Sequence, residues 1–92
     1  MKLDEIFASK AHAKLIQFLI ENRGKGFSQN HLARMTGLAP STVARVTANL
    51  ENLGLIQSAN LEGVKLITLR RETKLAQALT TLHEELRTIT KP

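Results

Sequence analysis

The spacing of Gln29, Ala33, Gly37 and Val43 constrains the fold of this chain more than any other feature of its sequence. Ala33 is small enough for a following helix to cross over it closely, and Gly37 suits a tight turn with a positive φ. Val43, six residues after that glycine, would anchor the second helix on the first. The spacing predicts two helices joined by a turn at about 90–120°, with the second helix projecting from the domain.

The rest of the chain predicts the order helix, helix, helix, hairpin, helix. The first three predicted helices each begin with a capping serine or a first-turn proline and end at a glycine. The three pairs are Ser9 and Gly24, Ser28 and Gly37, and Pro40 and Gly54. A short helical segment at 3–7 is expected before the first helix. Two β-rich runs, 55–59 and 64–69, flank a predicted turn at 60–63 and indicate a hairpin. Gly26-Phe27 could pair briefly with a strand, and the last helix is predicted from about Glu72 to Ile89.

Charge favours a nucleic-acid partner. The 92 residues carry a net charge of +5 with a pI near 10.1, and basic domains of this size often bind nucleic acid. No acidic residue lies between Glu21 and Glu51, whereas four basic residues do: Arg23, Lys25, Arg34 and Arg45. A hydrophobic content of 42% predicts a real core for one small domain.

Several function classes are excluded or disfavoured by residue type. The chain has no cysteine, which excludes a disulfide scaffold, a thiolate zinc site and a cysteine nucleophile. His12, His31 and His83 lie on separate segments, so we expect surface or capping histidines and no metal site. No nucleophile, base and orienting group are assembled, so we expect no enzyme and no cofactor. No apolar run approaches the roughly 20 residues of a membrane span, and we expect a soluble, cytoplasmic, nucleoid-associated protein.

The segment 37–45 and its continuation at 50–56 resemble the recognition helix and the start of the wing in the winged helix-turn-helix superfamily, in the group of MarR- and ArsR-like bacterial and archaeal regulators. Segments 7–10 and 69–72 also resemble small archaeal winged-helix regulators, so the resemblance covers nearly the whole chain. The chain lacks the cysteine ligands of metal-sensing ArsR proteins and is shorter than a usual MarR protein. The resemblance implies a mainly α fold with a small β-hairpin wing, comprising a DNA-binding winged helix-turn-helix over 1–71 and a C-terminal dimerisation helix over 72–92.

The resemblance also implies which residues contact DNA. The helix at about 40–53 would enter the major groove, where Arg45 could donate two hydrogen bonds to guanine. The residues expected at DNA are Ser28, Gln29, Asn30, Arg34, Pro40, Ser41, Thr42, Arg45, Asn49 and Lys65. For Ser41 and Thr42, capping of the helix is an equal alternative to DNA contact. For Arg45, the alternative to DNA contact is an ordinary solvated charge on the helix surface. The hairpin turn has no positive charge and contains Glu62, so we expect a small contribution from the wing.

The last helix carries an apolar seam with steps of four, three, four and three residues, formed by Leu75, Leu79, Leu82, Leu86 and Ile89. This spacing is typical of a helix that pairs with another helix. We expect a homodimer that binds two half-sites about 34 Å apart or a multiple of that distance. Packing of the seam on the chain's own first helix is the alternative.

Together these features predict sequence-specific binding of double-stranded DNA by a dimeric transcription regulator, with no membrane partner. One alternative is a DNA-segregation (centromere-binding) or architectural protein that coats DNA. Another is a winged helix that binds a protein partner, whose identity is unknown.

Overall fold

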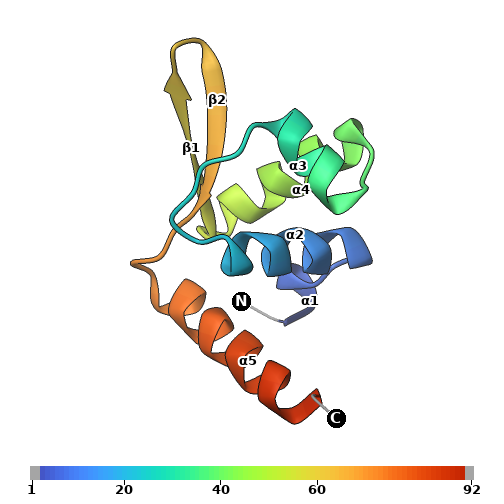
Figure 1. The fold of residues 1–92 in the computed structure, drawn as a ribbon, viewed down its shortest axis with the longest axis vertical. Helices are drawn as coiled ribbons and strands as arrows, with labels where there is room; N and C mark the ends of the chain where they lie inside the picture. The colour runs from blue at the N-terminus through green and yellow to red at the C-terminus, as the bar shows by residue number, and fades with distance from the viewer. Residues whose placement is uncertain (1–2, 91–92) are drawn as a thin grey trace.

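A computed structural model describes residues 3–90, in which five helices and one hairpin follow the predicted order (Figure 1). The elements are α1 (Leu3–Ile6), α2 (Lys10–Glu21), α3 (Gln29–Thr36), α4 (Pro40–Asn52), β1 (Ile56–Leu61), β2 (Val64–Leu69) and α5 (Lys74–Thr90). The outermost residues of the two expected regions 1–71 and 72–92, namely 1–2 and 91–92, lie outside the described part. The mainly α class with a small hairpin is confirmed.

Serine side chains begin the first two long helices, as predicted. The Oγ of Ser9 accepts a hydrogen bond from the backbone N–H of His12 at 3.3 Å, and the Oγ of Ser28 accepts one from the N–H of His31 at 3.1 Å. Each bond satisfies a backbone donor that has no partner within its helix.

The end of α2 differs from the prediction. The helix stops at Glu21, three residues before Gly24. Asn22 is its C-cap, and the side-chain Nδ2 of that residue donates to the carbonyl of Phe18 at 2.8 Å. The amide side chain therefore ends the helix, because it competes for a carbonyl at the last turn.

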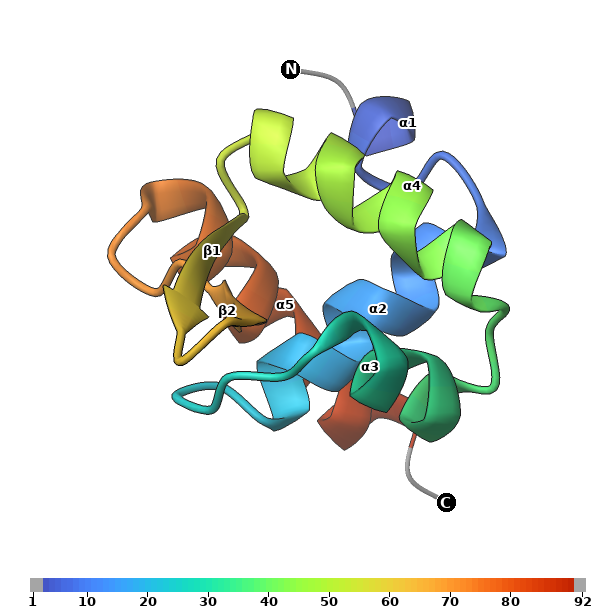
Figure 2. The same ribbon diagram turned by 90° about the horizontal axis from the view of Figure 1, so that it is seen from above.

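The core lies where α2, α3 and α4 meet and where the base of the hairpin closes over them (Figures 1 and 2). Its fully buried side chains are aliphatic and come from all of these elements: Leu15, Leu19, Leu32, Val43, Val46, Leu50, Leu55, Ile56 and Ile67. Phe27 joins the sheet, since its N–H donates to the carbonyl of Ile67 at 3.0 Å and its carbonyl accepts from the same residue at 2.7 Å. The predicted brief pairing at Phe27 is confirmed, and it fixes the hairpin to the helices.

The hairpin β1–β2, called the wing below, is antiparallel and turns more tightly than expected. Leu61 pairs with Val64, so only Glu62 and Gly63 form the turn. Their φ values are 52° and 82°, and a two-residue turn of this kind needs a positive φ at both positions. The predicted turn at 60–63 is therefore wrong in its bounds, because Asn60 and Leu61 belong to β1.

The last helix, α5, lies at the end of the molecule opposite the wing (Figure 1). Its N-terminal half buries Ala76 and Leu79 in the core. Beyond that point it touches the end of α2, where the Nε2 of His83 lies 3.3 Å from the Oε2 of Glu21. The C-terminal turns of α5 extend past the other elements.

Candidate nucleic-acid interface

The turn between α3 and α4 has the geometry that its glycine predicts. Gly37 adopts a φ of 72°, and its N–H donates to the carbonyl of Ala33 at 2.9 Å. Ala39 is the N-cap of α4 without a side-chain bond, and Pro40 occupies the first turn. Because the helix has already begun before Ser41 and Thr42, the capping alternative for these two residues is wrong, and their hydroxyl groups remain available.

The inward face of α4 holds it on the other two helices. Val43, Val46 and Leu50 are fully buried, as predicted. Thr47 is also buried, a position that the sequence analysis did not assign, and its Oγ1 donates to the carbonyl of Val43 at 2.7 Å. These contacts fix the rotation of α4 about its axis and therefore determine which side chains face solvent.

The opposite face of α4 presents polar side chains, and we call Ser41, Thr42, Arg45 and Asn49 the recognition face. Ser41, Arg45 and Asn49 are exposed and Thr42 is half-buried. Steps of four residues place the exposed three on one side of the helix, over about 12 Å of its length. Within residues 3–90, no carboxylate lies within 4 Å of the Arg45 guanidinium. The five N–H donors of Arg45 are therefore free for a ligand that accepts hydrogen bonds.

A buried histidine lies behind this face. The ring of His12 is almost completely buried, and its Nδ1 lies 2.9 Å from the Oγ of Ser9. Burial, and to a lesser extent the positive charge of Arg45, lower the pKa of His12 below its ordinary value. Although its backbone N–H takes part in the predicted capping, the expectation of a surface side chain is wrong for His12. Its spacing from Leu15, Ile16 and Leu19 places His12 on the buried side of α2, so helical periodicity could have found it. Only the packing of α4 on α2 brings positions 12 and 45 near each other.

The second group of expected DNA contacts lies on and beside α3. Asn30 and Arg34 are exposed one turn apart, whereas Ser28 and Gln29 are half-buried. The Oγ of Ser28 already accepts the capping bond, so its O–H remains as the donor. Viewed from above, α3 and α4 lie side by side, with the wing to one side of them (Figure 2). The structure thus brings nine of the ten expected residues together on one helix-turn-helix unit, Pro40 included, and leaves Lys65 on the wing.

Lys65 is exposed on β2 opposite Asn60. Strand alternation places both residues on the face of the wing that also carries the buried Ile67 and Leu69. That face looks towards the helices, so Lys65 and the recognition face lie on the same side of the wing.

Within 3–90, no three or more His, Asp or Glu side chains are grouped so that they could hold a metal ion. None of the helices in this range is both long and apolar enough to cross a membrane.

Comparison with known proteins gives a family. A model described as the Crp-like helix-turn-helix domain matches residues 13–78, which contain α3, α4 and the whole wing. No curated protein matches the sequence.

Solved structures with a similar fold include transcription regulators. A predicted DNA-binding transcriptional regulator from E. coli is 21% identical with a TM-score of 0.72, over 91% of this chain and 84% of that one. MepR, a transcription regulator of the Staphylococcus aureus multidrug efflux pump MepA, is 24% identical with a TM-score of 0.71, over 95% and 66% of the two chains. A MarR family protein from Bacillus stearothermophilus is 19% identical with a TM-score of 0.65, over 96% and 54%. These structures confirm the predicted winged-helix fold, and with the domain match they show that the chain belongs to the Crp-like helix-turn-helix family and is MarR-like in architecture.

Proposed function

We propose that this DNA-binding transcription regulator of winged-helix type recognises a specific double-stranded sequence as a homodimer. The observation that carries the proposal is the recognition face, where an exposed and unpaired Arg45 projects from a helix whose other side is locked in the core. Such a rigid helix can enter a major groove without reorganising. A chromosomal DNA partner would place the protein in the cytoplasm, on the nucleoid.

Each part of the helix-turn-helix has its own task in this proposal. Arg45 donates two hydrogen bonds to O6 and N7 of a guanine. Ser41 and Thr42, at the N-terminal end of α4, and Asn49, further along, bind phosphates or base edges. The polar residues around α3 bind the phosphate backbone and set the register: Ser28, Gln29, Asn30 and Arg34, with Pro40 at the start of α4. Lys65 adds one phosphate contact from the wing.

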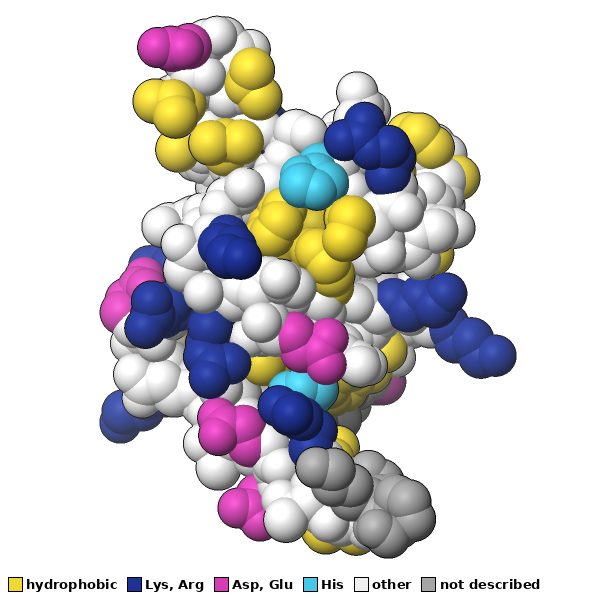
Figure 3. Space-filling view, in the orientation of Figure 1, with side chains coloured by type: hydrophobic (Ala, Val, Ile, Leu, Met, Phe, Trp, Pro, Cys, Tyr) yellow, Lys and Arg dark blue, Asp and Glu magenta, His cyan; other side chains and the backbone are white. Residues whose placement is uncertain are grey.

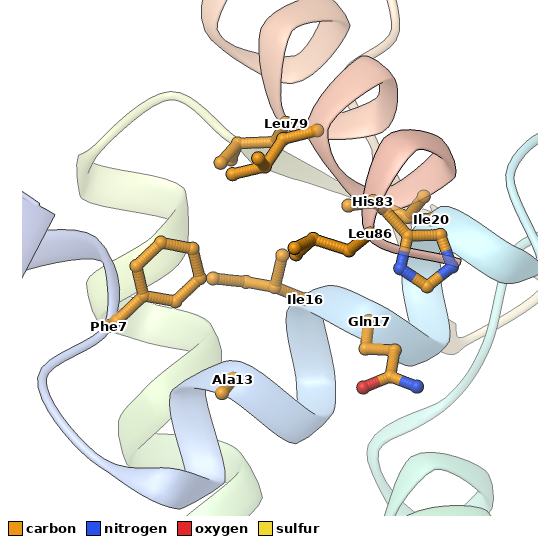
Figure 4. Close-up of a pocket in the computed structure, with 9 residues that line it drawn as sticks. Phe7, Ala13, Ile16, Gln17, Ile20, Leu79, His83 and Leu86 are labelled. Atoms are coloured by element: carbon orange, nitrogen blue, oxygen red, sulfur yellow. The ribbon is translucent and has the colours of Figure 1, made fainter. Parts of the chain in front are cut away.

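The homodimer is supported by the exposed half of α5. Leu82, Leu86 and Ile89 are 45%, 47% and 75% exposed, although they continue the seam that begins with Leu75 and Leu79. Beside them lies an apolar hollow of about 140 Å³ between α2, α5 and the segment that carries Phe7 (Figure 4).

A second copy of α5 would cover both the exposed leucines and this hollow. The first half of the seam would anchor α5 to residues 1–71, and the second half would dimerise. Two recognition helices would then lie one DNA turn apart, about 34 Å, or a multiple of it.

The proposal is tested by retaining fragmented genomic DNA on the purified protein at about 150 mM salt and sequencing the retained fragments. Near this salt concentration, binding that depends only on phosphates is weak, so we expect enrichment of a palindrome. Arg45→Ala should weaken binding to that sequence by about ten-fold or more, since one bidentate pair with a guanine contributes roughly 1–3 kcal/mol of discrimination.

Lys74→Ala is the matched control, because it removes the same charge from an exposed position at the start of α5. Equal affinity of Arg45→Ala and Lys74→Ala for the enriched sequence would overturn the assignment of the recognition face.

A further inference from the structure

A polar hollow of about 360 Å³ lies beside the start of α5, and we call it the arginine hollow. Its lining residues are Arg23, Arg71, Gln77, Thr80 and Thr81. None of them is among the ten residues expected at DNA, and α2 lies between α5 and the helix-turn-helix (Figure 1). Figure 3 shows Lys and Arg side chains gathered below the wing, on the left of the view. Part of the positive charge of this protein therefore lies outside the proposed DNA interface.

The tertiary structure brings the two arginines of this hollow together from distant parts of the sequence. Arg23 follows α2, and its Nη1 donates to the carbonyl of Ile20 at 2.8 Å, which fixes the guanidinium at the end of that helix. Arg71 precedes α5 and lies against the same loop, since a side-chain carbon on Gly24 would be 3.4 Å from its Nη1. Two like charges that line one hollow repel each other. An anion between them would turn this repulsion into attraction.

The chain itself supplies little negative charge at this place. Of the described carboxylates, none lies within 4 Å of the Arg71 guanidinium. The Nη2 of Arg23 is 3.9 Å from the Oε1 of Glu84, but these side chains are 42% and 57% exposed, and such a long, exposed pair contributes little. The adjoining hollow shares both arginines and adds Arg87 to the two carboxylates of Glu21 and Glu84. Guanidinium groups therefore outnumber carboxylates across the two hollows.

The other side chains of the arginine hollow add neutral hydrogen-bond donors. Thr81 is exposed, and its hydroxyl has no hydrogen-bond partner among the described residues. The Nε2 of Gln77 donates one N–H to the carbonyl of Arg71 at 3.3 Å and keeps the second N–H. Only Thr80 has already used its hydroxyl proton, in a bond of 2.8 Å to the carbonyl of Ala76. Two cations and two neutral donors thus line a hollow that contains no carboxylate.

We infer that the arginine hollow binds the phosphate group of a small phosphorylated compound. The fork of N–H donors on a guanidinium matches the oxygens of a phosphate. A phosphate monoester carries a charge of about −1.5 to −2 at pH 7, which balances two arginines. The DNA backbone offers the same chemical group, but the position of α2 between the hollow and the helix-turn-helix disfavours DNA as its source. The inference does not rest on the proposed DNA binding.

A bound phosphate would join the loop after α2 to the first turns of α5. The Tm of the wild type should therefore rise by several degrees in inorganic phosphate at about ten times its dissociation constant. Phosphate also stabilises folded proteins without binding to a site, so the rise is compared with that of Arg71→Gln. A smaller rise in the variant is expected, and equal rises would overturn the inference.

Titration with inorganic phosphate measures the binding itself, at an ionic strength held constant with sodium chloride. The arginine Nε–H signals in NMR spectra should shift and saturate, with a dissociation constant of about 1 mM or below. Arg23→Gln and Arg71→Gln should each weaken binding by about five-fold or more, because each removes charge-assisted hydrogen bonds. Arg70→Gln is the matched control, since Arg70 is adjacent in sequence but pairs with Glu72 at 2.9 Å and lines neither hollow.

Two results of this titration would overturn the inference. One is a set of shifts that do not saturate, and the other is equal affinity for phosphate in Arg71→Gln and Arg70→Gln. If Arg23→Gln unfolds because it loses the bond to the carbonyl of Ile20, Arg71→Gln still decides the outcome.

Binding of the enriched palindrome separates a small phosphorylated compound from DNA. Arg71→Gln and Arg70→Gln should bind this sequence with equal affinity. A loss found only in Arg71→Gln would assign the arginine hollow to the DNA backbone and would overturn the inference. Failure of the wild type to bind any specific sequence would instead contradict the proposed function, because phosphate binding is measured without DNA.

Discussion

Two amphipathic helices of this molecule, α4 and α5, have similar apolar spacing but different surroundings. The apolar side of α4 is buried from Val43 to Leu50. The seam of α5 is buried at Leu79 but 47% exposed at Leu86 and 75% exposed at Ile89. The helices α2 and α3 and the strand β1 pack against α4, whereas α5 extends beyond α2 (Figure 1). Helical spacing therefore predicts which side is apolar, but not whether the same chain covers it.

The largest expected effect is the difference in stability lost when one leucine is truncated in α4 and one in α5. Leu50→Ala should lower the free energy of unfolding by about 2–5 kcal/mol, because it leaves a cavity in a closed core. Leu86→Ala should lower it by less than 1 kcal/mol in the monomer, since its side chain is already half exposed. Urea denaturation at protein concentrations below dimer formation measures both values. Equal losses would show that the two helices do not differ in this way.

The second prediction tests the exposed part of the α5 seam through its effect on dimer formation. Leu86→Ser should raise the dissociation constant of the dimer by about ten-fold or more, as expected for a residue at the centre of an interface. Sedimentation equilibrium measures this change. Thr81→Ala, an exposed substitution outside the seam, is the control and should leave the constant unchanged. An unaffected dimer in the Leu86→Ser variant would assign the contact to another surface.

The third effect compares the first turns of α3 and α5. Ser28 accepts the N–H of His31 at 3.1 Å, and the Oγ1 of Thr73 accepts the N–H of Ala76 at 3.1 Å. Replacing either residue with alanine should cost about 0.5–2 kcal/mol of stability. Thermal unfolding measures that cost, and DNA affinity distinguishes the two variants, because only Ser28→Ala removes an expected phosphate contact. An equal loss of affinity in Thr73→Ala would contradict the division of tasks between α3 and α5.

The smallest expected effect is a pH dependence of folding stability caused by the buried His12, which lies near Arg45 of α4. The folded pKa of His12 lies below its ordinary value of 6.5, so the unfolded chain takes up this proton first as the pH falls. The contribution of neutral His12 to stability is therefore complete above pH 6.5 and is lost as the pH falls through the folded pKa. Denaturation between pH 5 and 8 should show this slope in the wild type and in Leu86→Ser. His12→Gln should reduce it, and an unchanged slope would exclude His12 as its source.

Much of the fold could be predicted because its signals are local. Ser9, Ser28 and Gly37 begin or end helices through bonds to near neighbours, and Pro40 suits the first turn of α4 because its ring fixes φ. Each was placed correctly. The turn of the wing was misplaced because Glu62, which has no special preference for a positive φ, shares it with Gly63. The ten expected DNA-contacting residues stay a prediction, although the structure supports a common surface for nine of them.

By itself, the sequence determined the helix-turn-helix, the apolar sides of the helices and the acid-free basic segment, since these depend on residue type and on spacing within a few turns. Only the tertiary structure decided that His12 lies near Arg45 of α4, that α5 is covered along half its length, and that the wing turns an apolar face away from the helices. Each of these depends on which distant segment lies opposite a side chain, and spacing along the chain carries no information about that.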